Sequence, residues 1–318
     1  MKNNDKVSCG STIELLRCRQ AYSLNGKLHL TKQRIKEWYE YHDGNVCVSF
    51  SGGKDSTVLL HIVRSMYPDV EAVFCDTGLE YPEIREFVKI IDNVTWLKPA
   101  KNFKRVIEEY GYPVVSKQVS YMISTIRNPT GKNDALINRY LNKINSAGEM
   151  VKKIVLAEKW KFLINAPFKI SDKCCDNFKK KPLKKYQKKT GKKPFIGTMA
   201  YESQMRARGY INNGCNAYDS KDQKSTPLAF WLEEDVWEYI EKNNLSYSKI
   251  YNMGYERTGC MFCMFGCHVE KEGRFLKMEK THPKQHNYCI NKLGLGKVLD
   301  YIGVEHTSKQ MDLFDEKT

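Results

Sequence analysis

The sequence lacks any long apolar run. No stretch approaches the roughly 18 apolar residues that a membrane-spanning helix needs. The opening segment, MKNNDKVSCG, lacks the apolar core of a signal peptide. We therefore expect a cytoplasmic protein without membrane contact. No internal repeat is visible, and 318 residues suffice for one large domain with appendages or for two domains.

Acidic residues are scarce relative to basic ones, with 37 Asp and Glu against 52 Lys and Arg and a net charge of +15. Such a surplus suggests a polyanionic partner, although many basic proteins bind no nucleic acid. The densest segment, 173–193, has ten lysines and one aspartate, with Phe178 and Tyr186 between them. Lysines interleaved with aromatic rings suit phosphates and exposed bases. We expect nucleic-acid contact there, and a merely solvated charged surface is the alternative.

Apolar strand patterns alternate with helical patterns in the first hundred residues. NVCVSF (45–50), VEAVFCDTG (70–78) and VTWLKP (94–99) are expected strands, and the segments between them have helical spacing. This alternation predicts an α/β fold with a parallel twisted sheet flanked by helices and right-handed crossovers. Further helices are expected at 133–144, 149–163 and 233–244, and a strand at 194–200.

A helical segment precedes the first strand. In TKQRIKEWYEYH, the residues Ile35, Trp38 and Tyr39 share one face, and Thr31 is the expected N-cap. We therefore expect one apolar helix face in this region, packed on the rest of the chain.

The segment SFSGGKDS (49–56) joins the first strand to its helix through two glycines. Gly52 and Gly53 let the backbone approach a phosphate, and the helix N-terminus favours an anion. Lys54 adds a positive charge, while Asp55 suits Mg²⁺ or a helix cap. The segment lacks the spacing of a Walker A loop. An ordinary glycine-rich turn is the alternative.

SGGKDS resembles the PP-loop of the adenine-nucleotide α-hydrolase superfamily, and the closest likeness is to the phosphoadenosine-phosphosulfate (PAPS) and adenosine-phosphosulfate (APS) reductase family. FCDTGLEYPEIREFV (74–88) and the segment 227–255 extend the likeness, which spans 45–265. The resemblance implies a Rossmann-like fold that binds ATP and Mg²⁺, the metal at Asp55 or Asp76. The nucleotide-binding residues it implies are Ser51, Gly52, Gly53, Lys54, Asp55, Ser56, Asp76, Thr77, Gly78, Ser203 and Arg206.

The sequence departs from the family in two places. Gly197, Ser203 and Arg206 match the family's Gly-x-Arg-x-x-Gln-Ser-x-x-Arg motif, but Met199 replaces its first arginine and Glu202 its glutamine. The reductases' C-terminal nucleophilic cysteine also has no counterpart, since no cysteine follows position 289. These losses favour the relatives that use ATP to replace oxygen by sulfur, the Dnd-type DNA phosphorothioation proteins and tRNA thiolases.

Four of the eleven cysteines form a pair and a later CxxC: Cys174, Cys175, Cys260 and Cys263. The pattern resembles the [4Fe–4S] ligands of the APS reductase branch, and zinc is the second candidate. Cys47 and Cys75, within strands, fit the role of small apolar residues. Cys267 could be a spare ligand, a sulfur-carrying thiol or inert. We favour the thiol, so Lys54, Asp55 and Cys267 are the expected catalytic residues.

These patterns divide the chain into an N-terminal helical segment (1–44), a PP-loop nucleotide-binding α/β domain (45–255), a Cys-rich cluster-binding region (256–304) and a flexible tail (305–318). In the tail, QMDLF (Gln310–Phe314) resembles the peptide that binds the bacterial sliding clamp. A clamp partner would favour DNA over tRNA. Packing of Leu313 and Phe314 on the chain's own domain is the alternative.

We therefore expect a PP-loop ATP pyrophosphatase and sulfurtransferase. It would adenylate an acceptor, expected to be a nucleic acid, and take sulfur from a donor such as a cysteine desulfurase. The first alternative is an APS or PAPS reductase of sulfate assimilation, using a thiol such as Cys267 or Cys289. The second is a non-catalytic nucleotide- and nucleic-acid-binding module with a structural cluster.

Overall fold

The structure is a computed structural model and describes residues 13–308. Within these residues the chain forms two compact units. The first holds 13–76, 80–98 and 182–258, and the second holds 77–79, 99–181 and 259–308. Each unit therefore contains segments that are far apart in the sequence. No helix among the described residues has the length and apolar content needed to cross a membrane.

The first unit is built on a six-stranded sheet with the order β3-β2-β1-β5-β7-β6. Its strands are β1 (Val46–Phe50), β2 (Ala72–Cys75), β3 (Val94–Leu97), β5 (Lys193–Ile196), β6 (Asn216–Ala217) and β7 (Lys224–Ser225). All neighbouring pairs are parallel except β6 with β7. β1 lies inside the sheet, between β2 and β5. The predicted α/β fold with a mostly parallel sheet is confirmed.

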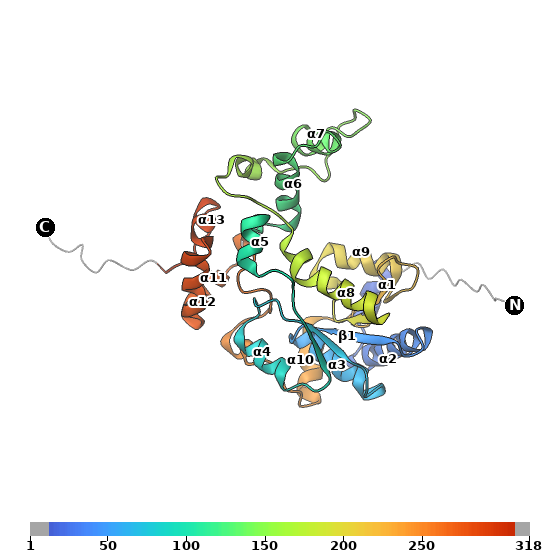
Figure 1. The fold of residues 1–318 in the computed structure, drawn as a ribbon. Coiled ribbons are helices and arrows are strands. Elements are labelled where there is room, and N and C mark those ends of the chain that lie inside the picture. Colours follow the sequence, from blue (N-terminus) through green and yellow to red (C-terminus); the bar gives the residue numbers. More distant parts are fainter. Residues whose placement is uncertain (1–12, 309–318) are drawn as a thin grey trace. The chain divides into compact units, whose positions relative to one another are not determined.

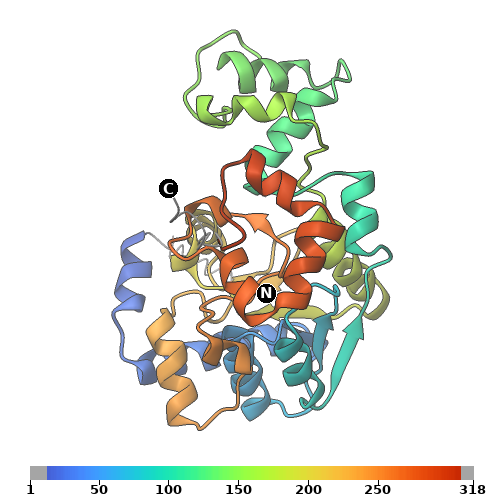
Figure 2. The same ribbon diagram turned by 90° about the vertical axis from the view of Figure 1, so that its left-hand side faces the viewer.

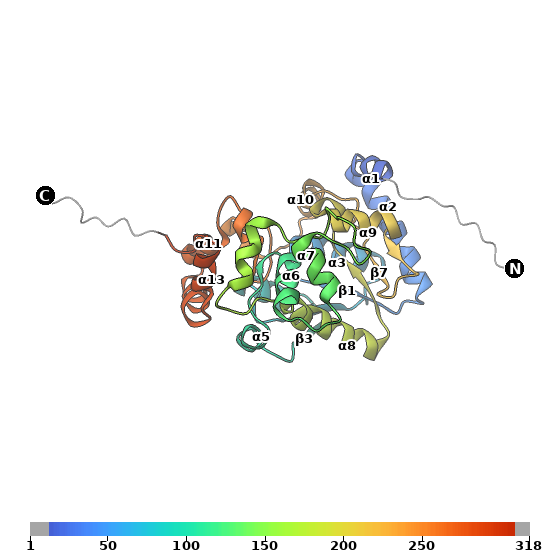
Figure 3. The ribbon, with the colours of Figure 1, turned by 90° about the horizontal axis from the view of Figure 1, so that it is seen from above.

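Helices surround this sheet. They are α1 (Ile13–Gln20), α2 (Leu24–Tyr41), α3 (Lys54–Met66), α4 (Pro82–Lys89), α9 (Gln204–Asn213) and α10 (Glu233–Lys242), with 3₁₀ turns η3 (Ala200–Glu202) and η4 (Lys249–Met253). α3 buries Val58, Leu59, Ile62 and Val63 and packs on β1. α2 and α10 pack on α3, and α1 lies beside α9 (Figures 1 and 3). The helix predicted at 233–244 is α10, and the strand predicted at 194–200 ends at Ile196.

α2 shows the predicted apolar face, since Ile35 and Trp38 are fully buried. The predicted N-cap is wrong. Ser23 caps α2 by accepting a hydrogen bond from the Gly26 N–H at 3.3 Å. Thr31 lies inside the helix, where its buried hydroxyl accepts from Trp231 Nε1 at 2.8 Å. The Thr31 hydroxyl therefore makes a long-range hydrogen bond with Trp231 and does not cap the helix.

The second unit is mainly helical, with one two-stranded parallel sheet of β4 (Val114–Val115) and β8 (Met264–Phe265). Figure 2 shows its last helices, in red, packed together. The helices are α5 (Phe103–Glu109), α6 (Lys117–Arg127), α7 (Asp134–Asn142), α11 (Arg274–Thr281), α12 (Pro283–Asn287) and α13 (Leu295–Tyr301), with shorter turns η1 (Glu158–Asn165), η2 (Asp176–Lys180), η5 (Cys267–Val269) and η6 (Tyr288–Lys292). η2 continues into α8 (Lys181–Thr190), most of which belongs to the first unit.

The helix predicted over 149–163 is wrong for most of its length. Met150 forms an isolated antiparallel bridge with Ile144, and the Leu156 N–H donates to the Tyr140 carbonyl. Only from Glu158 does the chain coil, as a 3₁₀ helix. Val151, Ile154 and Val155 supply β-branched side chains, which lower helix propensity, and tertiary hydrogen bonds outweigh the apolar spacing here.

Candidate functional site

The loop between β1 and α3 has a shape that only glycine allows at its second position. Gly52 has φ of +73°, in the left-handed region. A Cβ atom there would lie 2.8 Å from Cγ2 of both Ile84 and Val88 on α4. Both of these side chains are buried. The loop therefore packs closely against α4, which fixes the path of its backbone.

Hydroxyl groups hold the rest of the loop. Ser56 Oγ donates to the Gly53 carbonyl at 2.9 Å and accepts from the Ser51 N–H at 3.2 Å. Ser51 Oγ accepts from the Gly53 N–H at 3.4 Å. These bonds keep the loop's N–H groups at the N-terminus of α3, a helix of 13 residues. A loop and helix N-terminus of this kind form a site for an anion such as phosphate.

Lys54 begins α3 and is almost fully buried. Its Nζ atom lies 3.1 Å from Glu233 Oε1 and 3.4 Å from Asp55 Oδ1. Burial by itself lowers the pKa of Lys54, but Asp55, Tyr251 and Glu233 outweigh that effect and the pKa is raised. Lys54 is therefore charged at neutral pH and lies between two carboxylates that a bound phosphate could replace.

Asp55 has one buried carboxylate oxygen, Oδ1, that accepts no hydrogen bond from the described residues. The ion pair with Lys54 is the contact of this atom. Burial raises the pKa of Asp55, and Lys54 opposes the rise. A buried carboxylate oxygen with a free lone pair suits a hard cation such as Mg²⁺, so the residue fits the metal that the resemblance implies.

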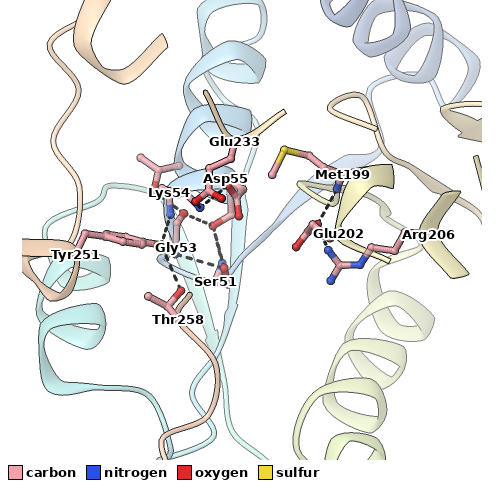
Figure 4. Close-up of polar contacts among 12 residues, drawn as sticks. Ser51, Gly53, Lys54, Asp55, Met199, Glu202, Arg206, Glu233, Tyr251 and Thr258 are labelled. Carbon is pink, nitrogen blue, oxygen red and sulfur yellow. Dashed lines mark hydrogen bonds and ion pairs between the residues drawn. The ribbon is translucent and has the colours of Figure 1, made fainter. Parts of the chain in front are cut away.

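Tyr251 and Thr258 complete the loop's surroundings, as Figure 4 shows. The Tyr251 hydroxyl accepts from the Lys54 N–H at 2.8 Å, and it lies 3.4 Å from Thr258 Oγ1. A Cβ atom on Gly53 would lie 2.7 Å from Thr258 Oγ1. Glu233, Tyr251 and Thr258 are not among the site residues expected from sequence. The signal for the first two was the resemblance of segment 227–255.

The segment with the altered motif lies beside the loop in the same unit. Ser203 caps α9 by accepting from the Arg206 N–H at 3.3 Å. The Glu202 carboxylate accepts from the Met199 N–H at 2.9 Å and forms an ion pair with Arg206. Met199, Ser203 and Arg206 also line a cavity of about 350 Å³. Glu202 thus neutralises the one cation that the motif retains.

Asp76, Thr77 and Gly78 follow β2. Asp76 is buried and accepts from Arg85 Nη2 at 2.9 Å, within the first unit. Thr77 and Gly78 belong to the second unit, where Thr77 Oγ1 accepts from the Leu79 N–H at 3.1 Å. The role of these three residues in nucleotide binding stays a prediction.

The four cysteines of the predicted cluster all lie in the second unit. The Cys174 thiol donates to Cys175 Sγ at 4.0 Å. This hydrogen bond, then burial, and then the charges of Cys175, Cys263 and Cys260 raise the pKa of Cys174. Burial raises the pKa of Cys263 to about 12, and Cys260 adds to the effect. Cys260 and Cys263 thus lie near enough to Cys174 to affect its pKa, and the four-cysteine site stays a prediction.

Four thiols from two segments match the donor set of a [4Fe–4S] cluster, in which each thiolate binds a different iron. In residues 13–308, no group of three or more His, Cys, Asp or Glu side chains is arranged so that it could hold a metal ion. Four cysteines suit zinc as well as a [4Fe–4S] cluster by donor chemistry, and the cofactor stays a prediction.

Cys267 has the surroundings of a structural thiol. It is buried and donates to the Met264 carbonyl at 3.0 Å. Burial raises its pKa to about 11, and Arg274 only partly opposes the shift. A buried, protonated thiol is a poor nucleophile. Its predicted sulfur-carrying role stays a prediction. The predicted clamp-binding segment, Gln310–Phe314, lies outside the described residues.

Comparison with known proteins places these features in a family. The family model for the phosphoadenosine phosphosulfate reductase domain matches residues 45–126 and 117–265. An adenosine 5′-phosphosulfate reductase of Anoxybacillus flavithermus is 27% identical over 264 residues, which cover 80% of this chain and 88% of that protein. An uncharacterised protein of Methanocaldococcus jannaschii is 27% identical over 275 residues, covering 81% of this chain and 51% of that protein.

The chain therefore spans about half the length of this archaeal relative. Among solved structures, the U34-tRNA thiolase NcsA of Methanococcus maripaludis, described with its [4Fe–4S] cluster, is similar with a TM-score of 0.40 and 17% identity. That similarity covers 91% of this chain and 87% of the thiolase. The family model covers well over half of the sequence, and the chain belongs to the phosphoadenosine phosphosulfate reductase domain family.

Proposed function

We propose that this chain is an enzyme that binds ATP, releases pyrophosphate and transfers sulfur to the adenylated acceptor, a nucleic acid. The observation that carries the proposal is the loop at the N-terminus of α3. At this loop, backbone N–H groups and the buried, charged Lys54 side chain lie together, where an anion such as phosphate could bind. The relatives named as adenosine 5′-phosphosulfate reductases also act on an adenine nucleotide, which supports this ligand class.

In the proposed reaction, the terminal phosphates of ATP replace the groups that now occupy the loop. Lys54 Nζ exchanges the Glu233 carboxylate for phosphate oxygens, and the Lys54 N–H exchanges the Tyr251 hydroxyl for another. Asp55 or Asp76 would hold Mg²⁺, which would supply positive charge to offset that of the phosphates. An acceptor oxygen attacks the α-phosphorus, the bond to the bridging oxygen breaks, and pyrophosphate leaves. Charge stabilisation of the leaving pyrophosphate is the chain's main catalytic contribution.

Sulfur held as a persulfide on a donor such as a cysteine desulfurase is reduced by a thiol to hydrosulfide, with formation of a disulfide. The hydrosulfide then attacks the adenylated carbon or phosphorus of the acceptor, and AMP leaves with the acceptor's oxygen. Cys174, Cys175, Cys260 and Cys263 would hold a [4Fe–4S] cluster. When bound, such a cluster supplies a site that can bind sulfur or electrons. In this chain, Lys117 and Lys179 lie near enough to Cys175 to lower its pKa, although the hydrogen bond from Cys174 has the larger effect.

Reduction of a sulfonucleotide is the second candidate, favoured by the names of the relatives. The ion pair between Glu202 and Arg206 argues against it, because it removes a free cation that a sulfate group would need. Binding of nucleotide without any reaction is the third candidate, and the same experiment separates all three.

The test uses the full chain purified without oxygen, with iron, sulfide and bound nucleic acid measured on the same sample. Pyrophosphate release from ATP is followed with and without DNA or RNA. We expect release that nucleic acid stimulates and that Lys54→Ala abolishes. Lys242→Ala, an exposed helical lysine also paired with a glutamate, is the matched control. Sulfite release from adenosine-phosphosulfate with thioredoxin would select the reductase, and binding without turnover would select the third candidate.

A further inference from the structure

The lysines of α8 are arranged on one side of the helix. Those at positions 181, 184, 185, 188 and 189 are all exposed, whereas the remaining side chains of the helix are half-buried. The spacing of three and four residues places all five on one face of an α-helix. We call these five residues the lysine ridge. It extends over nine residues, and its ends are about 12 Å apart at the rise of an α-helix.

The opposite face of α8 fixes the ridge in place. The Tyr186 hydroxyl and Lys192 Nζ both donate to the Glu71 carboxylate. Glu71 is the residue directly before β2. Burial raises the pKa of Tyr186, and the bond to Glu71 adds to the rise. Phe178 is only 1% exposed, so the prediction that its ring contacts bases is wrong. The basic segment therefore offers charge on a fixed helix rather than a stacking surface.

Few acidic groups neutralise the ridge. Lys184 forms an exposed ion pair with Asp222 at 3.1 Å, and Lys181 Nζ donates to the neutral Asn177 Oδ1 at 2.8 Å. For Lys185, Lys188 and Lys189, no carboxylate lies within ion-pair distance in the described part of the chain. Like charges three and four residues apart repel one another and destabilise a helix. A polyanion lying along the ridge would remove this repulsion.

We infer that the lysine ridge binds the phosphate backbone of a nucleic acid. A membrane surface is disfavoured because the apolar residues of α8, such as Leu183, face the protein and none is exposed for insertion. A linear row of cations on a fixed helix suits a regular chain of phosphates, and lysine–phosphate contacts carry no sequence information. Binding of nucleic acid by the ridge does not depend on the proposed function. Only the further step, that the bound nucleic acid is the acceptor of sulfur, rests on it.

The experiment measures binding of a labelled duplex and a labelled single strand by fluorescence anisotropy at several salt concentrations. Four ridge lysines are changed to glutamine: Lys184, Lys185, Lys188 and Lys189. The control changes four exposed lysines of the second unit to glutamine and so lowers the net charge equally: Lys280, Lys284, Lys292 and Lys297. A third variant changes the ridge lysines to arginine and keeps the charge.

We expect the glutamine ridge variant to bind at least about tenfold more weakly at low salt. A plot of log affinity against log salt should become less steep in this variant. The slope should be smaller in magnitude by about 0.9 per lysine for duplex DNA and by about 0.7 per lysine for a single strand. The control and the arginine variant should behave like the unchanged chain. Equal weakening of ridge variant and control would overturn the inference, as would an unchanged slope in the ridge variant.

Two further measurements keep this inference separate from the proposed function. Binding of polyglutamate as tight as that of nucleic acid would overturn the choice of partner. ATP affinity, measured without nucleic acid, reports on loop 51–56, and pyrophosphate release reports on the proposed reaction. If the ridge binds nucleic acid but the chain releases no pyrophosphate from ATP, the proposed function fails and the inference stands.

Discussion

Replacement of Gly52 by alanine tests the packing that shapes the loop. The left-handed conformation, with φ of +73°, costs an L-residue about 1–2 kcal/mol. Reduced freedom of the unfolded chain offsets about 0.4–1 kcal/mol of this. The new Cβ would also lie 2.8 Å from two buried methyl groups, those of Ile84 and Val88. Overpacking of this kind costs about 1–3 kcal/mol. We therefore expect Gly52→Ala to lower the free energy of unfolding by about 2–4 kcal/mol.

Gly191→Ala is the matched control in the same unit. Its φ is +74°, almost identical, but the nearest atom to a new Cβ is the Asn45 side-chain amide at 3.1 Å, a group that can move. This variant should lose only about 1 kcal/mol. Urea unfolding, followed by tryptophan fluorescence and circular dichroism, gives both values at a common m-value. If the two variants differ by less than about 0.5 kcal/mol, the loop is not pressed against α4 and the account of its shape fails.

Three other substitutions probe the site and the fold. Glu202→Gln keeps an acceptor for the Met199 N–H but releases Arg206, so the affinity for adenosine-phosphosulfate should rise about fivefold in a titration, the value of an exposed ion pair; an unchanged affinity would contradict the neutralising role of Glu202. Thr31→Val leaves the buried Trp231 N–H without its acceptor and should cost about 1–3 kcal/mol of unfolding free energy, whereas Thr31→Ser should cost less; equal losses would refute the hydrogen bond. Cys174→Ser should remove visible absorbance and iron from anaerobically prepared protein, while Cys18→Ser, at an exposed position, should not; iron retained in full by the first variant would rule out that ligand.

The local features of the first unit were predictable from sequence. Strands β1, β2 and β3 and the helices between them follow from short apolar runs and helical spacing, and Gly52 follows from the turn that must join strand to helix. The order of β5, β7 and β6 was not predictable, because pairing of short strands is decided by long-range packing. The same holds for Thr31, whose partner Trp231 is 200 residues away.

The candidate site divides in the same way. The loop residues 51–56 and the four cysteines are recognisable as motifs, since their chemistry depends on local spacing. Glu233 and Tyr251 act on Lys54 from positions 179 and 197 residues further along the chain. The resemblance of segment 227–255 covers both residues, but only the folded structure shows their contacts with Lys54. Phe178 was misread because a ring between lysines gives no local sign of which side of the helix is buried.

The central claim is that the terminal phosphates of ATP bind the loop between β1 and α3. A crystal structure of the chain with Mg²⁺ and an ATP analogue that resists cleavage between the α- and β-phosphates tests it most directly. We expect phosphate oxygens to accept from the Gly53 and Lys54 N–H groups, and Lys54 Nζ to have moved from Glu233 to phosphate. A nucleotide bound elsewhere, with Tyr251 and Glu233 still on Lys54, would contradict it.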